Sequence, residues 1–119
     1  LVSFGFKHGL PMEADLVFDV RFMPNPFYID AMREKTGLDR EVRDYVFSFQ
    51  ETEQFMEKLR ELLGFVLPLY REEGKTVLVV AVGCTGGRHR SVAVTHALAG
   101  YVTSLGYQVT ENHRDMMRT

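Results

Sequence analysis

A glycine-rich turn carries the residues whose types and spacing are best suited to chemistry. It runs Val82-Gly83-Cys84-Thr85-Gly86-Gly87-Arg88-His89-Arg90-Ser91, between an apolar stretch and a helix-forming segment. A strand, a glycine turn and a helix in that order form an anion site, because the turn presents backbone N–H groups. The helix adds the unpaired amides and the positive dipole end of its first turn. The turn therefore predicts a phosphate site.

Each side chain of the turn has a role in such a site. Gly86 and Gly87 are expected to adopt positive φ and to let a ligand approach the backbone closely. The guanidinium forks of Arg88 and Arg90 match the oxygens of a phosphate. Further donors come from Thr85, His89 and Ser91, and the serine can also cap the helix. A turn that only joins strand to helix, with both arginines in solvent, is the alternative.

The same turn also matches the spacing of a cysteine phosphatase. Cys84 is followed by five residues and then Arg90-Ser91, the C-x5-R-[S/T] pattern of protein tyrosine phosphatases. That reaction needs a thiolate at a helix N-terminus, an arginine fork and an acid for the leaving group. Asp19 or Asp115 could supply the acid, but Gly83 stands where those enzymes have a histidine. We expect Cys84 to be a core residue, with the phosphatase as the alternative function.

A metal site is the third possibility. The candidate ligands are His8, His89, His96 and His113. His89 and His96 lie two helical turns apart, too far to share an ion without other ligands. We therefore expect no metal site and no catalytic residue in this chain.

Composition limits the functions that the chain can have. A length of 119 residues with 45% hydrophobic content predicts a single domain. The net charge of −2 gives no overall positive field for nucleic acid or an anionic membrane. One cysteine excludes an internal disulfide and fits a reducing cytosol. No membrane-spanning run or signal peptide is present, and Leu1 suggests a piece of a longer protein, so we expect a cytoplasmic fragment without membrane contact.

Four strands are expected from the hydrophobic pattern. They cover residues 2–7, 16–22, 76–82 and 107–110, and the third is apolar on both faces, as in the centre of a parallel sheet. Lys7 and His8 end the first strand. Asp19 and Arg21 share one face of the second, where they either neutralise each other or hold an anion and a sugar hydroxyl. The sequence leaves both interpretations open.

Helices are expected over residues 27–36, 39–47, 51–72 and 91–105, with Pro68 kinking the third. The tail from His113 to Arg118 is expected to be ragged. The prediction is a small single α/β domain over residues 1–119, with a mostly parallel sheet of about four strands and helices on both faces. Ligands collect at the carboxyl ends of such strands, where the glycine turn lies.

Four segments resemble the C-terminal domain of the RapZ/YvcJ family. They are Ser3 to Gly9, Val17 to Pro26, Gly83 to Ser91, and His113 to Asp115, in that order. The resemblance implies an N-terminal P-loop domain with ATPase and GTPase activity outside this chain. ATP and GTP would bind there, since this chain has no G-x-x-x-x-G-K-[S/T] motif.

The resemblance also implies a regulatory, metabolite-sensing role. In the enterobacterial branch this domain senses glucosamine-6-phosphate and binds small RNA and partner proteins as an RNase adapter. Carried over by motif, the ligand residues are His8, Thr85, Gly86, His89 and Arg90. We add Gly87, Arg88 and Ser91, with Lys7, Asp19 and Arg21 in support. The expected ligand is an amino-sugar phosphate or a nucleotide sugar, and the chain is expected to form a homo-oligomer without a cofactor of its own.

One departure from that branch concerns RNA. RNA binding there depends on a lysine- and arginine-rich C-terminal end, whereas this chain ends Asp115-Met116-Met117-Arg118-Thr119. An RNA interface needs several phosphate contacts. The expectation of RNA binding is correspondingly lower.

Overall fold

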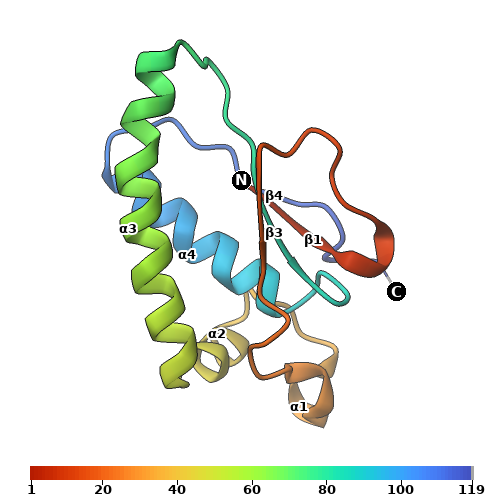
Figure 1. Ribbon diagram of the computed structural model, residues 1–119. Helices are drawn as coiled ribbons and strands as arrows, with labels where there is room; N and C mark the ends of the chain where they lie inside the picture. Colours follow the sequence, from red (N-terminus) through yellow and green to blue (C-terminus); the bar gives the residue numbers. More distant parts are fainter. Residues whose placement is uncertain (119) are drawn as a thin grey trace.

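The computed structural model describes residues 1–118 and contains one four-stranded parallel sheet (Figure 1). The strands lie in the order β2-β3-β1-β4, and their bounds are Val2–Gly5 for β1, Leu16–Asp19 for β2, Val80–Cys84 for β3 and Asn112–His113 for β4. Gly5 pairs with Cys84, and Asp19 pairs with Gly83. Because every pair is parallel, the carboxyl ends of the strands meet at one edge of the sheet.

The strands are shorter than the hydrophobic pattern predicted. β1 ends at Gly5, because the chain then turns through a 3-10 helix, η1, over Phe6–His8. β2 ends at Asp19 rather than residue 22, since the chain turns at Val20, whose carbonyl accepts the N–H of Met23.

The other two strands lie further along the chain than expected. β3 begins at Val80, and the strand predicted over residues 107–110 is wrong. The last strand forms at Asn112–His113, where the Asn112 N–H reaches the carbonyl of Leu1. Edge pairing with β1, and not local strand propensity, fixes its position.

The helices follow the predicted order with different ends. Their bounds are Asp30–Arg33 for α1, Arg40–Phe47 for α2, Gln50–Glu73 for α3 and Arg90–Ser104 for α4, with a second 3-10 helix, η2, at Pro26–Tyr28. The helix predicted over residues 27–36 is thus two short pieces. The 24-residue helix α3 continues past Pro68 and ends at Gly74, which has a φ of 100°.

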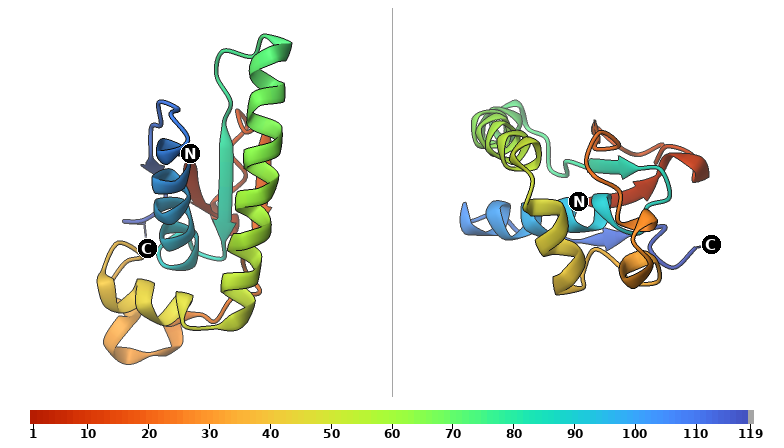
Figure 2. Two further views of the ribbon diagram at one scale, coloured as in Figure 1. Left: turned by 90° about the vertical axis from the view of Figure 1, so that its left-hand side faces the viewer. Right: turned by 90° about the horizontal axis from the view of Figure 1, so that it is seen from below.

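Helices α3 and α4 lie side by side on one face of the sheet (Figure 2). Val82 and Cys84 of β3 join the buried core there, with side chains of α2, α3 and α4. On the opposite face the ring of Phe4 packs against that of Phe6, with centroids 4.8 Å apart. The predicted α/β domain with a parallel sheet of four strands is confirmed, and within residues 1–118 the two long helices, α3 and α4, lie on the same face of the sheet and not one on each.

Candidate functional site

A pocket of about 380 Å³ opens at the carboxyl ends of the strands, and we call it the carboxyl-end pocket. Five of its lining residues are basic, namely Lys7, Arg33, Arg88, Arg90 and Arg118. Glu34 is the one carboxylate in the described lining. The other lining residues are Asn25, Phe27, Tyr28, Cys84, Thr85, Gly86 and His89. The excess of cations makes this pocket electropositive in a protein whose net charge is −2.

Close backbone contacts set the shape of the glycine turn. Gly87 has a φ of 82°, and a Cβ there would lie 2.6 Å from the Gly5 nitrogen and 2.8 Å from the Phe4 carbonyl carbon. A Cβ on Gly5 would lie 2.4 Å from the carbonyl of Gly86. Gly5 and Gly87 are therefore required by packing.

Gly86 is different, because it does not adopt positive φ and packing does not require it. The nearest atom to a Cβ placed there would be Cε of Lys7, at 3.8 Å. The expectation of positive φ at Gly86 is wrong. A side chain at this position would extend into the carboxyl-end pocket beside Lys7.

Three backbone N–H groups of the turn make no hydrogen bond within the described residues. Within residues 1–118, the amides of Gly86, Arg88 and His89 meet no hydrogen-bond acceptor of the protein. All three residues line the pocket. The Gly87 N–H instead donates to Sγ of Cys84 at 3.3 Å.

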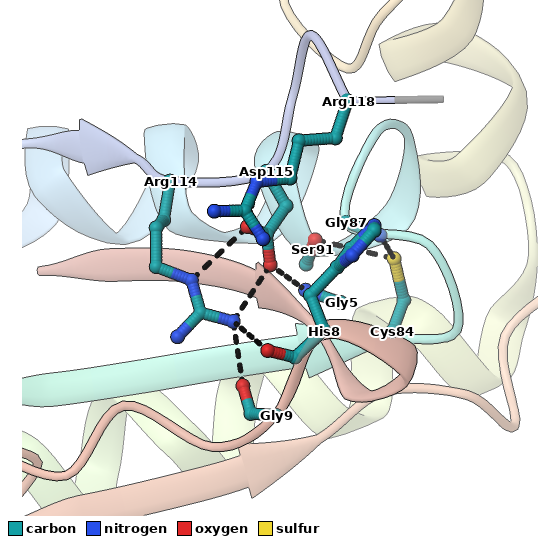
Figure 3. A network of polar contacts seen from close by, with 9 residues as sticks. All are labelled: Gly5, His8, Gly9, Cys84, Gly87, Ser91, Arg114, Asp115 and Arg118. Carbon is teal, nitrogen blue, oxygen red and sulfur yellow. Dashed lines mark hydrogen bonds and ion pairs between the residues drawn. The ribbon is translucent and has the colours of Figure 1, made fainter.

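Cys84 lies beneath the turn with 2% of its surface exposed (Figure 3). Its Sγ also lies 3.2 Å from Oγ of Ser91. Ser91 is thus bound to the cysteine and does not cap α4, whose N-cap residue, His89, makes no side-chain capping bond. Cys84 and Ser91 together hold the turn against the start of α4.

Arg90 is 4% exposed and ties the end of β2 to the turn. Its Nη1 donates to the carbonyls of Arg21 at 2.6 Å and Met23 at 3.0 Å. Nη2 donates to Oγ1 of Thr85 at 3.4 Å, and buried Nε has no partner. Nη1 therefore holds the segment that follows β2 in place. Nη2 makes only a long contact, so this nitrogen can donate to a ligand.

Arg88 uses its guanidinium on backbone carbonyls. Nε donates to Lys35 O at 3.0 Å, Nη1 to Met116 O at 3.3 Å, and Nη2 to Glu34 O. These bonds join the turn, the end of α1 and the C-terminal segment. Each guanidinium nitrogen of Arg88 thus gives one N–H to the protein, while the main-chain amide of Arg88 meets no acceptor within residues 1–118.

His89 is also tied to the end of α1. Its Nε2 lies 3.1 Å from Met32 O and 3.2 Å from Arg33 O, and a carbonyl can only accept, so Nε2 carries the proton. Burial lowers the pKa of His89, outweighing the carbonyls, which favour the charged form. The imidazole is neutral at neutral pH.

Asp19 and Arg21 form an ion pair with each other, and neither residue lines the pocket. Nη2 of Arg21 lies 2.6 Å from Oδ2 of Asp19, and Nε lies 3.0 Å from both carboxylate oxygens. This hydrogen bonding lowers the pKa of Asp19. The Arg21 guanidinium also stacks 3.9 Å from the ring centroid of Phe6. Of the two interpretations left open by the sequence, mutual neutralisation is the one that the geometry shows.

A buried carboxylate, Asp115, organises the C-terminal segment (Figure 3). It is 0% exposed, and its Oδ2 accepts the Gly5 N–H at 2.7 Å and Nη2 of Arg114 at 2.8 Å. Arg118 pairs with Oδ1 at 3.4 Å. Burial raises the pKa of Asp115, but the bonds from Arg114 and Gly5 outweigh it and the net shift is downward. The expected ragged tail is wrong through Arg118, because these bonds anchor it to β1.

His8 lies in this second network and not among the residues that line the pocket. Its carbonyl accepts from Nη2 of Arg114 at 3.4 Å, and its Nε2 is buried without a partner. Gly87 and Ser91 are likewise behind the pocket lining. Of the predicted site residues, the structure brings together Lys7, Thr85, Gly86, Arg88, His89 and Arg90.

The remaining histidines meet at one carboxylate. Nδ1 of His96 and Nε2 of His113 lie 2.9 Å and 2.6 Å from Oε2 of Glu111. Burial raises the pKa of Glu111, but the two imidazoles outweigh it and lower the pKa. Across residues 1–118, no group of three or more His, Cys, Asp or Glu side chains is arranged to hold a metal ion.

Sequence reasoning missed the segment that forms the far wall of the pocket. This segment follows β2 and contributes Asn25, Phe27, Tyr28, Arg33 and Glu34. A signal was present, because Pro24-Asn25-Pro26 lies in the loop that follows β2, a strand of a parallel sheet. Loops at that edge are where such sheets bind ligands.

Comparison with known proteins identifies the family. The model of the RapZ C-terminal domain matches residues 1–117. The chain belongs to the RapZ C-terminal domain family. Nucleotide-binding proteins of Acetivibrio thermocellus and Geobacillus thermodenitrificans are each 58% identical to it, over 98% and 99% of the chain. A nucleotide-binding protein of Alkaliphilus oremlandii is 56% identical over 97% of the chain.

The chain spans only part of these relatives. It covers 40% of the Acetivibrio and Alkaliphilus proteins and 39% of the Geobacillus protein. Among the residues that the structure describes, no helix combines the length and the apolar character needed to cross a bilayer.

Proposed function

We propose that this RapZ C-terminal domain is a regulatory sensor that binds a phosphorylated amino sugar, such as glucosamine-6-phosphate, or a nucleotide sugar. The phosphate group binds in the carboxyl-end pocket. The observation that carries this proposal is the set of amides of Gly86, Arg88 and His89, which meet no acceptor within residues 1–118 and lie at the start of α4. Unpaired amides at a helix N-terminus favour an anion.

The side chains around these amides add charge without closing the pocket. Lys7 lies beside Gly86, and Nη2 of Arg90 makes only a long bond to Thr85. An ammonium and a guanidinium corner give charge-assisted hydrogen bonds to phosphate oxygens. In this proposal Arg88 and His89 hold the turn through their side chains and bind the ligand through their backbone.

The domain binds its ligand without transforming it. A phosphatase would need an acid near Cys84, but Asp19 is forked by Arg21 and Asp115 is paired with Arg114. Both pairs favour the ionised carboxylate, which cannot protonate a leaving group. We expect no turnover of an aryl phosphate by the parent protein. Turnover that disappears in Cys84→Ser would support the phosphatase instead.

Calorimetry on the parent protein and on a variant whose pocket is filled by a larger side chain tests the proposal. The parent should bind glucosamine-6-phosphate and not glucosamine, because the phosphate provides the anchor. Gly86→Leu should abolish binding while the fold survives, since its side chain extends into the pocket where no backbone atom is close. Gly100→Leu is the matched control, because Gly100 is exposed on α4 with no atom within 4 Å of a Cβ. Equal binding by Gly86→Leu and the parent would place the ligand elsewhere.

Small RNA is a second candidate ligand, on the observation that Lys7, Arg33 and Arg118 all lie at this pocket. The last two are 42% and 54% exposed, so they can contact a phosphate backbone. Filter binding across a salt series should give a steep loss of affinity with salt. A flat response, or no retention at low salt, counts against an RNA adapter role.

The remaining parts of the proposal concern the longer protein. The chain covers about 40% of relatives named nucleotide-binding proteins. ATP or GTP binding and hydrolysis are proposed to belong to a part of the longer protein outside this chain. The complete protein is proposed to be a cytoplasmic homo-oligomer that engages partner proteins. Pocket occupancy would then regulate those contacts.

A further inference from the structure

We infer that Phe27 and Tyr28 form an aromatic wall of the carboxyl-end pocket that selects phosphate esters whose organic part is a ring. This inference rests on the proposed function, because the phosphate anchors the ligand. The wall would recognise the rest of the molecule. The ring is either the apolar face of a sugar or a nucleobase, since an aromatic side chain stacks on both.

Both aromatic side chains are exposed at the pocket. Phe27 is 49% exposed and Tyr28 is 77% exposed, and both contribute to the lining. Their rings lie 5.6 Å apart with an interplanar angle of 85°. Exposed aromatic surface beside a cluster of cations is typical of a ligand site, because a packed core would have buried it.

The chain holds this wall in place before any ligand arrives. Oδ1 of Asn25 accepts the Phe27 N–H at 3.1 Å, and the Asn25 carbonyl accepts the Tyr28 N–H at 3.3 Å. Pro26 is buried and begins η2. A preorganised wall spends little conformational entropy on binding.

Arg33 fixes Phe27 from the other side. Its Nε donates to Phe27 O at 2.9 Å, its guanidinium lies 5.1 Å from the ring centroid, and Asp30 pairs with it at 3.0 Å. Phe27 is therefore engaged within the protein. Tyr28, the more exposed ring, is the better platform for stacking.

The size of the pocket agrees with a ligand larger than phosphate. About 380 Å³ is within the range of pockets that hold small organic molecules. A phosphate ion has five non-hydrogen atoms and would fill only the end beside Gly86 and Lys7. The space toward Phe27 and Tyr28 is left for the organic group.

Four probes and four variants, one of them a control, test the wall. The probes are inorganic phosphate, glycerol 3-phosphate, glucosamine-6-phosphate and uridine monophosphate, each titrated by calorimetry. Tyr28→Ala should leave the affinities for the first two unchanged and weaken a ring-bearing probe about tenfold, the scale of one aromatic stack. Tyr28→Phe should restore that affinity. Phe65→Ala is the matched control, because Phe65 is 69% exposed on α3 and does not line the pocket.

The outcomes separate the inference from the function on which it rests. If the parent binds none of the four probes, the proposed function fails and the inference with it. If the phosphates bind but Tyr28→Ala and Phe27→Ala change no affinity, or weaken all four equally, the wall is overturned while the function stands. If the variants lose affinity for glucosamine-6-phosphate alone, the wall is supported and its partner is the face of a sugar. If they lose affinity for uridine monophosphate alone, the wall is supported and its partner is a nucleobase.

Discussion

The two ends of the sheet carry pockets that differ in size and lining. The amino-end pocket is the larger, about 770 Å³, and is lined by Leu63, Leu67 and Val102 together with residues 75–80 and 106–110. The carboxyl-end pocket is half that size and lined by five basic residues. The proposed anion site is therefore the smaller of the two pockets, and it is chosen for the chemistry of its lining and not for its volume.

Helix direction accounts for part of this difference. α4 starts at the glycine turn and ends at Ser104, while α3 ends at Glu73, beside the amino-end pocket. The carboxyl end thus receives the amide end of α4, and the amino end receives the carbonyl ends of two helices. Amide ends attract anions and carbonyl ends repel them.

Matched glycines at the two ends should give the largest contrast in stability. Gly87→Ala should lower the free energy of unfolding by about 4 kcal/mol, because it combines positive φ with backbone clashes. Gly106→Ala, at a φ of 94° with no atom within 4 Å of a Cβ, should lower it by only about 1 kcal/mol. Urea unfolding measures both. Equal losses would mean that the turn relaxes freely.

Removing a carboxylate at each end of the sheet should give the second-largest contrast in stability. Asp115→Ala should destabilise the domain by about 3 kcal/mol, because it leaves the Gly5 N–H unpaired and Arg114 without its buried partner. Asp15→Ala, near the amino end, removes a bond to the Val79 N–H and an ion pair with Lys75. Its carboxylate is 29% exposed, so a smaller loss than for Asp115→Ala is expected. Thermal or urea melts of the two variants should rank in that order.

The smallest effect is a pH dependence that belongs to the carboxyl end. The pKa of His89 is lowered in the folded state, so below its unfolded value of about 6.5 the unfolded chain binds a proton that the folded chain lacks. Stability should therefore fall between pH 7 and pH 5, by at most about 1.4 kcal/mol per pH unit. The carboxylates with lowered pKa values act only at more acidic pH.

His89→Gln separates this contribution from the others. The glutamine amide can still donate to the carbonyls at the end of α1, but it does not titrate. The slope of unfolding free energy between pH 7 and pH 5 should become shallower in this variant. An unchanged slope would assign the pH dependence to other groups.

The strand, turn and helix around Cys84 could be predicted because each depends on nearby residues. The side-chain partners could not. Arg88 reaches Lys35 and Arg90 reaches Arg21, 53 and 69 residues away, so arginines assigned to a ligand are partly used by the fold. The position of the last strand could not be predicted either. β4 forms where the carbonyls of Leu1 and Ser3 accept its hydrogen bonds, and not where the sequence is most strand-like.

The contact between Gly5 and the Gly86 carbonyl limits how this pocket can be re-engineered. A Cβ at Gly5 would lie 2.4 Å from that carbonyl, so Gly5, behind the pocket lining, tolerates no other residue. Tyr28, in the pocket lining, has no such restriction, because its side chain is 77% exposed and lies edge-on to the ring of Phe27. A mutant library seeking new ligand preferences should therefore randomise Tyr28 and keep Gly5 unchanged.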